Sequence, residues 1–480
     1  MKPLLIPYPK QIGFSAGAPL LPADAPVTFT YAPGLREEAY VLKTANGAVN
    51  VTASADAGRF YAEQTLMQLS AAGGLREGLD IHDAPAFSYR GFMIDCCRHF
   101  YGVPELKRLI DAAARFKLNR FHWHLTDDQG WRIEIKKYPL LTEVGSKRSG
   151  SRFGGVNEGK PHGGFFTQAE IREVVDYCAA RHIEVIPEIE MPGHFTAAIS
   201  AYPFLGCTGE PMEPVQKEGI YPNVLCVGSD EAVSFMKDVL GEVCALFPGR
   251  YVHIGGDEAP RKRWQACEKC AARMKRLGLA DYDALQGSFI EEIAAFLREK
   301  GKTAITWNES LRGGCLSPEN VIVQRWMDRD NLCAGFTKRG GSVIESDFYH
   351  YYFDYPYGMT PLRKAFTYDP AEKTGAQGIF GVEGALWTEY VRSFHDLCQK
   401  LFPRLLAVAE RGWSGAPGRS YADFTAAVQA LLPLLGEGVA PMLPPDRWDP
   451  GMRRRLKEVA SFFKGPLSAD TLRQLLENRE

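Results

Sequence analysis

Short apolar runs alternate with longer amphipathic stretches over most of the chain. From Tyr89 onward eight such runs recur, several of them separated by stretches with helical periodicity. Strands that alternate with helices form parallel sheets, and about eight such units close into a barrel. The pattern therefore predicts an α/β fold, a (β/α)8 TIM barrel. The expected strands are Phe92–Arg98, Arg120–Asp127, Ile183–Glu190, Tyr251–Glu258, Thr303–Glu309, Val321–Trp326, Ser342–Asp347 and Ile379–Glu389.

Two of the helical stretches carry clear end signals. Thr167 and Glu170 have the spacing of a capping box, which marks a helix start. The run from Asp281 to Lys300 places apolar side chains on one face and stops before Gly301, a residue that favours helix ends. Both stretches are therefore predicted to be helices between barrel strands.

The two ends of the chain differ from this middle part. Residues 1 to about 86 are rich in Pro, Gly and Ala, with short alternating runs and one helical pattern from Gly58 to Leu69. We therefore expect a small α+β domain over 1–86, the barrel over 87–415, and a helical C-terminal extension over 416–480. The total of 480 residues fits a barrel of about 250 residues or more with appended parts.

The overall composition is that of an ordinary globular protein. The formal net charge is −2 and no basic stripe is present, so nucleic acid is not an expected partner. No run of about 18 uninterrupted apolar residues occurs, so no membrane span is expected. The segment Met1–Pro7 is too short for a signal-peptide core, and the 11 cysteines are odd in number and scattered. These features predict reduced thiols and a cytoplasmic location.

Cys267 and Cys270 have the spacing of half a zinc site. No second close pair accompanies them, and both lie in a run with helical pattern. Ordinary thiols are therefore the favoured interpretation, and we expect neither a metal nor another cofactor.

Polar and aromatic side chains gather where the expected strands end. In TIM barrels the carboxyl ends of the strands converge on one face, which carries the active site. So many functional side chains at these positions are hard to explain as ordinary loop edges. They are Arg98, His99, His124, Asp127, Asp128, Glu190, His194, Asp257, Glu258, Trp307, Glu309, Trp326, Asp347, Trp387 and Glu389.

The most informative segment is Val252–Pro260, which contains Asp257 beside Glu258. Neighbouring buried carboxylates repel, so the pKa of one of them should rise and give a proton donor beside an anion. Glycosidases need such a pairing. Both side chains can enter one pocket only if the backbone twists, which Gly255 and Gly256 would allow. The alternative for this segment alone is a turn with two surface acids.

A metal-dependent hydrolase is a second interpretation of the strand ends. His122 and His124 form a His-x-His pattern, which is a metal-ligand arrangement in barrel hydrolases. Further ligands would have to come from later strands, and His194 and Asp347 are the candidates. This hypothesis predicts that chelators abolish activity and that Glu258 is dispensable.

Residues 40–415 closely resemble glycoside hydrolase family 20, the β-N-acetylhexosaminidases. Its motifs occur here in the family's order. The segments that carry the resemblance are Met93–Phe100, Asn119–Trp131, Glu188–His194, Val252–Pro260, Thr306–Glu309, Gln324–Trp326, Tyr351–Tyr355 and Leu386–Glu389.

This resemblance implies a substrate-assisted mechanism. Glu258 would act as general acid and then as general base, while Asp257 would orient the substrate's own 2-acetamido group. The carbonyl oxygen of that group attacks the anomeric carbon and gives an oxazolinium ion, so no enzyme nucleophile is needed. His194 would pair with Asp127 or Asp128, with Asp127 favoured, and the pair would tune the proton affinity of Glu258.

The same resemblance implies the residues that bind the sugar. Arg98 would hold the hydroxyls at ring positions 3 and 4, and Glu389 would accept from the 4-hydroxyl. Tyr352 would donate to the acetamido carbonyl and Asp354 would bind near the 6-hydroxyl, although the dense tyrosines leave a shift by one residue open. The three tryptophans expected to wall the site are Trp307, Trp326 and Trp387.

Some positions depart from the family or match nothing. Asn308 stands where many relatives carry an acid after the tryptophan, so the contact made by that acid is in doubt. The loops 149–166 and 203–227 match no recognisable pattern, and we expect them to set what binds beyond the terminal sugar.

The favoured hypothesis is a retaining exo-β-N-acetylhexosaminidase without cofactor, acting on oligosaccharides or glycoconjugates that end in N-acetylhexosamine. The alternatives are the metal-dependent barrel hydrolase and a catalytically silent glycan-binding barrel. The presence of both carboxylates together with the aromatic side chains disfavours the silent barrel. The preference between GlcNAc and GalNAc, the natural glycan and the oligomeric state are not specified by the sequence.

Overall fold

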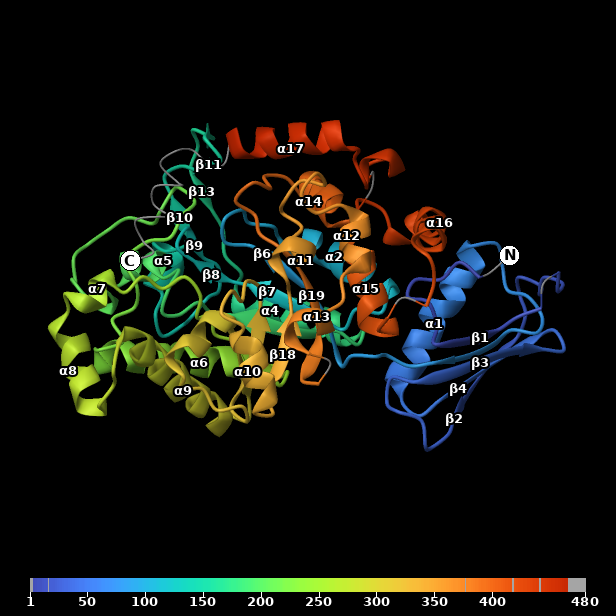
Figure 1. Ribbon diagram of the computed structural model, residues 1–480, viewed down its shortest axis with the longest axis horizontal. Helices are drawn as coiled ribbons and strands as arrows, with labels where there is room; N and C mark the ends of the chain where they lie inside the picture. Colours follow the sequence, from blue (N-terminus) through green and yellow to red (C-terminus); the bar gives the residue numbers. More distant parts are fainter. Residues whose placement is uncertain (1–2, 16, 376, 417, 440–441, 465–480) are drawn as a thin grey trace.

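Eight parallel strands close into a barrel at the centre of the molecule (Figure 1). The computed structural model describes residues 3–15, 17–375, 377–416, 418–439 and 442–464. The strands follow one another around the barrel in the order β14-β15-β16-β17-β18-β19-β6-β7, and every neighbouring pair is parallel. The predicted TIM barrel is confirmed. Its strands are β6 (Tyr89–Asp95), β7 (Arg120–His124), β14 (Glu184–Glu188), β15 (Tyr251–His253), β16 (Thr303–Trp307), β17 (Val321–Arg325), β18 (Ser342–Glu345) and β19 (Ile379–Leu386).

Helices or a 3-10 segment connect successive strands on the outside. Both predicted helix starts are present: Thr167 and Glu170 form the capping box, and the Asp281 carboxylate accepts from the Ala284 amide. The elements that complete the barrel are α2 (Val103–Arg115), α4 (Gln168–Ala179), α6 (Asp230–Leu246), α9 (Tyr282–Glu299), η2 (Asn308–Gly313), α10 (Leu332–Lys338), α12 (Leu362–Thr367) and α15 (Arg404–Ser414).

The strands end earlier than the sequence pattern predicts. The expected strand Tyr251–Glu258 stops at His253, and the expected strand Arg120–Asp127 stops at His124. Gly255 and Gly256 both have positive φ, 61° and 101°, which breaks the extended conformation after His253. The candidate catalytic side chains therefore lie on loops that follow the strands.

The barrel interior is filled in layers. At the amino ends of the strands an apolar layer contains Tyr89, Ile186, Tyr251, Ile305, Ile322 and Ile344. Two residues further along their strands, Glu188, His253, Trp307 and Gln324 occupy the next inward positions, since side chains on a strand alternate. The apolar layer closes one end of the barrel, and the polar layer forms a floor beneath the opposite face.

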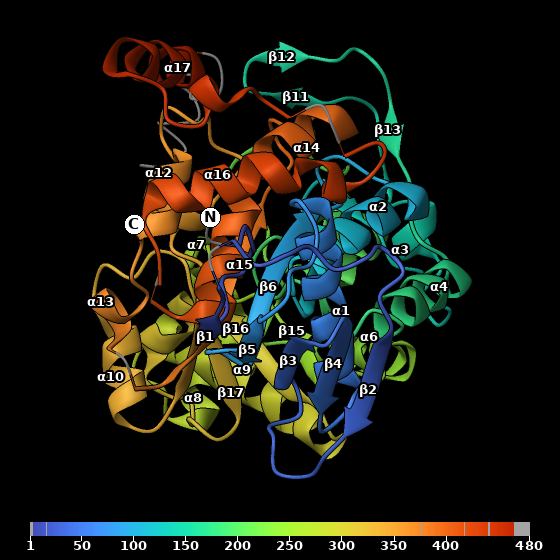
Figure 2. The same cartoon turned by 90° about the vertical axis from the view of Figure 1, so that its right-hand side faces the viewer.

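A five-stranded sheet covered by one helix forms the N-terminal part (Figure 2). Its strand order is β1-β5-β3-β4-β2, and β3 and β4 join through a tight turn in which Asn46 and Gly47 both have positive φ. This confirms the small α+β domain. The elements are β1 (Gln11–Gly13), β2 (Val27–Tyr31), β3 (Tyr40–Ala45), β4 (Ala48–Ala53), α1 (Asp56–Ala71) and β5 (Asp80–Asp83).

Helices also form the described part of the C-terminal region, as predicted. The last of them, α17 (Met452–Lys464), lies across the top of the barrel in Figure 1, where Phe462 packs against Tyr355 and Tyr390. The others in this region are α16 (Tyr421–Leu431), η3 (Leu432–Leu435) and η4 (Pro445–Arg447). Residues 465–480 of the predicted extension lie outside the described residues.

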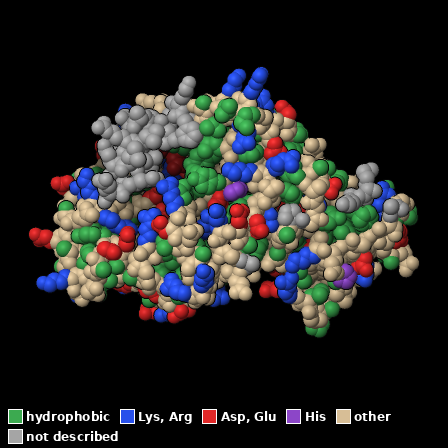
Figure 3. Space-filling model, viewed as in Figure 1, with side chains coloured by type: hydrophobic (Ala, Val, Ile, Leu, Met, Phe, Trp, Pro, Cys, Tyr) green, Lys and Arg blue, Asp and Glu red, His purple; other side chains and the backbone are tan. Residues whose placement is uncertain are grey.

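Long loops with short elements extend from the carboxyl ends of the strands. They contain β8 (Thr126–Asp127), β9 (Gly130–Trp131), α3 (Leu140–Glu143), β10 (Lys147–Arg148), β11 (Arg152–Phe153), β12 (Val156–Asn157), β13 (His162–Gly163), α5 (Thr196–Ala201), η1 (Pro203–Leu205), α7 (Lys262–Gln265), α8 (Glu268–Leu277), α11 (Phe348–Tyr351), α13 (Ala371–Thr374) and α14 (Phe394–Leu401). Among the described helices, none is long and apolar enough to cross a membrane. Basic and acidic side chains are interspersed on the face drawn in Figure 3.

Two buried cations join the N-terminal domain to the barrel. Arg90 of β6 is fully buried and pairs with Glu38 at 2.6 Å. Lys117, which precedes β7, contacts Asp83 at 3.2 Å and Tyr40 Oη at 2.8 Å. Since a buried charge without a partner is costly, these pairs fix the domain against the bottom of the barrel.

We predict that Glu38→Ala lowers the free energy of unfolding by about 3 kcal/mol, because Arg90 would be left buried without its anion. The measurement is chemical denaturation followed by circular dichroism. Glu37→Ala is the matched control, since Glu37 is exposed and should change stability by less than about 0.5 kcal/mol. Equal stability of the two variants would contradict the role assigned to the pair.

Candidate active site

A cavity opens at the carboxyl ends of the barrel strands. It gathers side chains from the loops after most of the strands, as expected for this fold. Its lining contains Arg98, Asp127, Glu190, His194, Asp257, Glu258, Trp326, Phe348, Tyr352, Asp354, Tyr355, Trp387, Glu389 and Tyr390. Of the eleven residues predicted for the site, ten line this cavity, and Trp307 lies beneath it.

Backbone conformation brings Asp257 and Glu258 into one cavity. Gly255 and Gly256 turn the chain after β15, and a Cβ at Gly255 would clash with the carboxylate of Glu190. Glu258 itself has a φ of 40°, a region that costs free energy for any residue other than glycine. The predicted role of the two glycines in the turn is therefore confirmed.

The pKa shift predicted for one member of the pair falls on Asp257. Burial raises the pKa of Asp257 well above its usual range, and the neighbouring carboxylates Glu309 and Glu258 add to this rise, while His194 opposes it. The side chain of Asp257 is 11% exposed, whereas that of Glu258 is 29% exposed. Water and substrate therefore reach Glu258 more readily than its neighbour.

His194 connects the pair to two further acids. Its Nδ1 lies 3.3 Å from Asp127 Oδ1 and 3.2 Å from Asp128 Oδ2, and its Nε2 lies 3.7 Å from Asp257 and 3.6 Å from Glu258. Although burial disfavours the charged form, Asp127 and Asp257 raise the pKa of His194 well above its usual value. The ring is therefore a cation that links carboxylates on both sides.

Both acids predicted as alternatives for the histidine reach it, but their surroundings differ. Asp127 lines the cavity and pairs with Arg98 at 2.7 Å. Asp128 does not line the cavity, and its carboxylate accepts from the amide and the hydroxyl of Thr196, at 3.0 and 2.5 Å. Asp127 thus belongs to the cavity, and Asp128 anchors the loop that carries His194.

Arg98 is held by acidic groups on several loops. Its guanidinium contacts Asp95 at 3.2 Å and Asp127 at 2.7 Å, with Glu389 at 3.6 Å, and donates to Gln129 at 2.9 Å. A planar guanidinium fixed in this way presents its remaining donor capacity in one direction. Its orientation into the cavity suits the recognition of two adjacent hydroxyl groups.

Aromatic rings form one wall of the cavity. Tyr352 stacks on Trp326, with ring centroids 6.0 Å apart and an interplanar angle of 20°, and lies 6.1 Å from Trp387. Trp307 is buried in the floor, where its Nε1 donates to Glu188 at 2.8 Å and its ring lies 6.1 Å from Trp387. Trp307 therefore supports the wall from below.

The register of the tyrosine-rich segment is unambiguous in the structure. Tyr352 and Asp354 line the cavity, whereas Tyr351 is buried elsewhere. Burial raises the pKa of Asp354 to about 7, with a further contribution from Glu389, and burial likewise raises the pKa of Glu389 to about 7 despite Arg98. Two carboxyl groups at this end of the cavity therefore change charge near neutral pH.

Several cavity residues were not among the predicted site residues. Glu190 and Tyr355 lie in segments that resemble the family but were given no role, Phe348 and Tyr390 lie in no such segment, and Glu309 lies beside the cavity lining through its contact with Trp326. Glu309 accepts from Trp326 Nε1 at 2.8 Å, and burial raises its pKa to about 7. An acid two residues after the strand-ending Trp307 was the sequence signal that could have predicted Glu309 as a site residue.

Asn308, the departure from the family pattern, has a structural task. Its side-chain oxygen accepts from the Trp326 amide at 3.0 Å, and its amide group donates to the Met327 carbonyl at 3.1 Å. It therefore fixes the end of β17 and the tryptophan that follows.

The pattern His122-x-His124 lies below the cavity and is occupied by carboxylates. Glu188 and Glu383 contact the two ring nitrogens of His122, each at 2.9 Å, and raise its pKa to about 10 although burial opposes the charge. Asp347 pairs instead with Arg325 and His350 and does not join His194. The predicted set of His122, His124, His194 and Asp347 is therefore not brought together at one point, since Asp347 has partners elsewhere.

Several buried polar atoms of the cavity lining lack a hydrogen-bond partner within the described part of the chain, and three of them belong to predicted substrate-contacting residues. These three are Asp257 Oδ1, Asp354 Oδ1 and Trp387 Nε1. Buried polar groups are nearly always satisfied, so these atoms are suited to a polar ligand that donates to the two carboxylates and accepts from the indole.

Comparison with known proteins identifies the family. The sequence pattern described as "Glycosyl hydrolase family 20, catalytic domain" matches residues 87–416, and "Glycosyl hydrolase family 20, domain 2" matches residues 21–84. The chain belongs to glycosyl hydrolase family 20.

Relatives and solved structures of family 20 resemble the chain over most of its length. It is 40% identical to a β-hexosaminidase of Porphyromonas gingivalis over 81% of this chain and 52% of that protein. It is 35% identical to a β-hexosaminidase of Akkermansia muciniphila over 82% of each chain. A crystal structure of a β-N-acetylhexosaminidase is 31% identical with a TM-score of 0.84, covering 94% of this chain and 99% of that one. The chain thus spans about half the length of its Porphyromonas gingivalis relative.

Glu309, Asp354 and Glu389 predict a pH-dependent stability. Their native pKa values of about 7 lie above those of the unfolded chain, so the native state binds more protons between about pH 4.5 and 7. Their contribution is present below that window and is lost as the pH rises through it. Glu389→Gln should therefore gain stability relative to the wild type as the pH rises, by an amount of the order of 3 kcal/mol.

Thermal unfolding of both proteins between pH 4.5 and 8 tests this expectation. Glu299→Gln, at an exposed position near the end of α9, is the control and should keep a constant difference from the wild type. A constant difference for Glu389→Gln as well would contradict the elevated pKa.

Proposed function

We propose that this protein is a retaining exo-β-N-acetylhexosaminidase that hydrolyses terminal β-linked GlcNAc or GalNAc by substrate-assisted catalysis. The observation that carries the proposal is the adjacent pair Asp257 and Glu258. Both carboxylates lie next to His194, in one cavity that is lined by aromatic rings. The names of the family 20 relatives, β-hexosaminidases, support the same activity.

In this mechanism Glu258 moves the proton. Its side chain is the more exposed of the pair, so it can reach the glycosidic oxygen and later a water molecule. It first protonates the leaving oxygen and then, as a carboxylate, removes a proton from the water that opens the intermediate. His194, held by Asp127, sets the electrostatic environment of this proton transfer.

Asp257 acts on a nucleophile that belongs to the substrate. The 2-acetamido group presents an N–H, and Asp257 Oδ1 is a buried acceptor that has no hydrogen-bond partner among the described residues. Substrate binding brings that N–H to the carboxylate and favours its ionised form, which stabilises the positive charge of an oxazolinium ion. The stacked Tyr352 and Trp326 supply the flat apolar surface that an acetamido methyl group needs.

The other end of the cavity recognises the sugar hydroxyls. Arg98 and Glu389 lie 3.6 Å apart and can bind neighbouring hydroxyls as donor and acceptor, and Asp354 offers a further buried acceptor. Acceptors and donors gathered around the hydroxyls of one sugar fit a terminal residue, which supports exo cleavage. The substrates are oligosaccharides or glycoconjugates that end in N-acetylhexosamine, and the free cysteines support action in a reducing compartment, the cytoplasm.

A pair of nitrophenyl glycosides tests the substrate-assisted route. We expect the 2-acetamido-2-deoxy-β-glucoside to be cleaved with a kcat/KM at least about a thousand-fold above that of the plain β-glucoside, because only the former carries the nucleophile. Both have the same leaving group, so the comparison isolates the 2-substituent. Similar kcat/KM values for the two glycosides would exclude the mechanism.

Two variants separate the roles of the acidic pair. Glu258→Gln should lower kcat/KM by about 10²–10⁴-fold on a disaccharide and much less on the nitrophenyl glycoside, whose leaving group needs no protonation. Asp257→Asn should impair both substrates similarly, since its partner is the acetamido group they share. Glu299→Gln serves as the unaffected control. Full activity of Glu258→Gln on the disaccharide would remove that residue from the acid role.

A further inference from the structure

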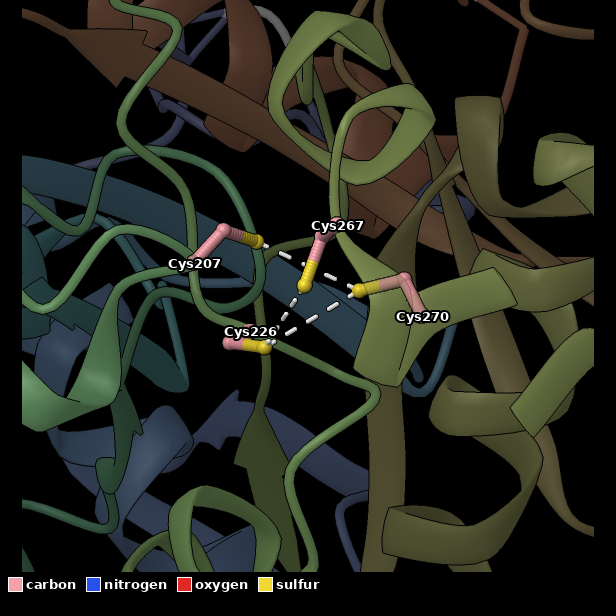
Figure 4. Close-up of side chains that lie close together, drawn as sticks. All are labelled: Cys207, Cys226, Cys267 and Cys270. Carbon is pink, nitrogen blue, oxygen red and sulfur yellow. Dashed lines mark hydrogen bonds between the residues drawn. The ribbon is translucent and has the colours of Figure 1, made fainter. Parts of the chain in front are cut away.

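Four cysteines that play no part in the candidate active site converge at one point beside the barrel. Cys207 follows η1, Cys226 lies in the loop before α6, and Cys267 and Cys270 begin α8. Figure 4 shows the four thiols pointing toward one another from these separate segments. Cys226, Cys267 and Cys270 are buried and Cys207 is half-buried.

The spacing of the four sulfur atoms matches a single tetrahedral ion. The Sγ atoms lie 3.7 Å apart for Cys226 and Cys267, 3.9 Å for Cys226 and Cys270, and 4.0 Å for Cys207 and Cys270. Four sulfurs about 2.3 Å from a central zinc ion lie about 3.8 Å from one another. A disulfide would need a separation of about 2.05 Å, so none of these pairs is bonded.

Backbone geometry around the sulfurs also suits metal thiolates. Cys267 is the N-cap of α8 and Cys270 lies in its first turn, and the N-terminus of a helix favours nearby negative charge. The Gly228 amide donates to Cys226 Sγ, and a Cβ at Gly228 would clash with the Cys270 backbone. Such close approach gives the sulfur outer-shell hydrogen bonds of the kind that orient metal ligands.

Two of the four cysteines lie within a basic segment of the chain. Residues 261–276 contain seven basic side chains and one acidic side chain. A divalent ion with four thiolates carries a net charge of −2, and this basic segment would stabilise it.

The four thiols connect the two loops that carry the catalytic groups. The loop after β14 contains His194, Cys207 and Cys226, and the loop after β15 contains Asp257 and leads to Cys267. A hydrogen bond also joins the two loops directly, since the Trp264 indole donates to Leu225 O at 2.9 Å. Within the first loop the Leu225 amide donates to Pro192 O at 2.9 Å.

We propose that Cys207, Cys226, Cys267 and Cys270 bind one structural zinc ion that fastens these two loops to each other. The site is closed, with four protein ligands, so its task is to stabilise the loops rather than to take part in the reaction. The sequence pattern placed Cys267 and Cys270 in a helical run, whereas Cys267 is the N-cap of α8. The two further ligands, Cys207 and Cys226, have no other cysteine near them in the sequence.

Metal analysis of the purified full chain tests the proposal independently of glycosidase activity. We expect about one zinc per chain after production in zinc-supplemented medium and desalting. Cys226→Ser and Cys207→Ser should each reduce the zinc content to traces and lower the melting temperature. Cys244→Ser, which alters a half-buried thiol outside the cluster, should keep both the zinc and the melting temperature.

Measurements on the wild-type protein are enough to overturn the proposal, so the test does not depend on whether the variants fold. Traces of zinc together with eleven thiols that react after denaturation would show an empty cluster of reduced cysteines. A mass lower by the hydrogens lost in disulfide formation would show bonded pairs instead. Stoichiometric iron would overturn the identity of the ion.

Discussion

Compensation of buried negative charge is the constraint on which the face at the carboxyl ends of the strands depends. This face collects acidic side chains from almost every loop, and only a few cations stand among them. Arg98 binds Asp95, Asp127 and Glu389, and holds the pKa of Asp95 well below its usual range although burial opposes it. His194 extends the series to Asp257. Burial nevertheless raises the pKa values of Glu389 and Asp257 although these cations oppose the shift, so one site contains both anions and proton donors.

A polar floor carries this arrangement. Glu188 accepts from Trp307 Nε1 and contacts His122 and His253, all within 2.9 Å. On the opposite side His122 contacts Glu383, which also accepts from Gln324 at 2.6 Å. A buried polar network is stable only when its polar groups have partners, so the residues of the floor cannot shift freely. The floor therefore restricts the position of the aromatic wall above it.

Much of this could be predicted from local sequence. The alternation of apolar runs and amphipathic stretches predicted the barrel, and the polar and aromatic residues at the strand ends predicted nine of the side chains that line the cavity. Tyr352 and Asp354 were expected only from the family resemblance. The extent of the strands was wrong, because apolar pattern continues through Gly255 and Gly256 whereas their φ values end β15. Periodicity reports which residues are buried and does not report where the backbone turns.

The remaining features depend on contacts between distant segments. His122 has the spacing of a metal ligand, but its partners come from other strands, and Glu383 lies 261 positions away. The thiol cluster escaped prediction for the same reason, since Cys207 and Cys226 have no cysteine near them in the sequence. A local sequence pattern cannot distinguish a metal ligand from a structural residue when the neighbouring side chains come from distant parts of the sequence.

The C-terminal helix α17 bears on how members of the family can come to differ from one another. Phe462 packs on Tyr355 and Tyr390, two side chains that line the cavity without belonging to the catalytic motifs. The rim of the cavity is thus built in part by the last described segment of the chain. Changes in that segment can reshape the entrance while the barrel and its charged residues stay as they are, so selectivity and chemistry are free to evolve separately.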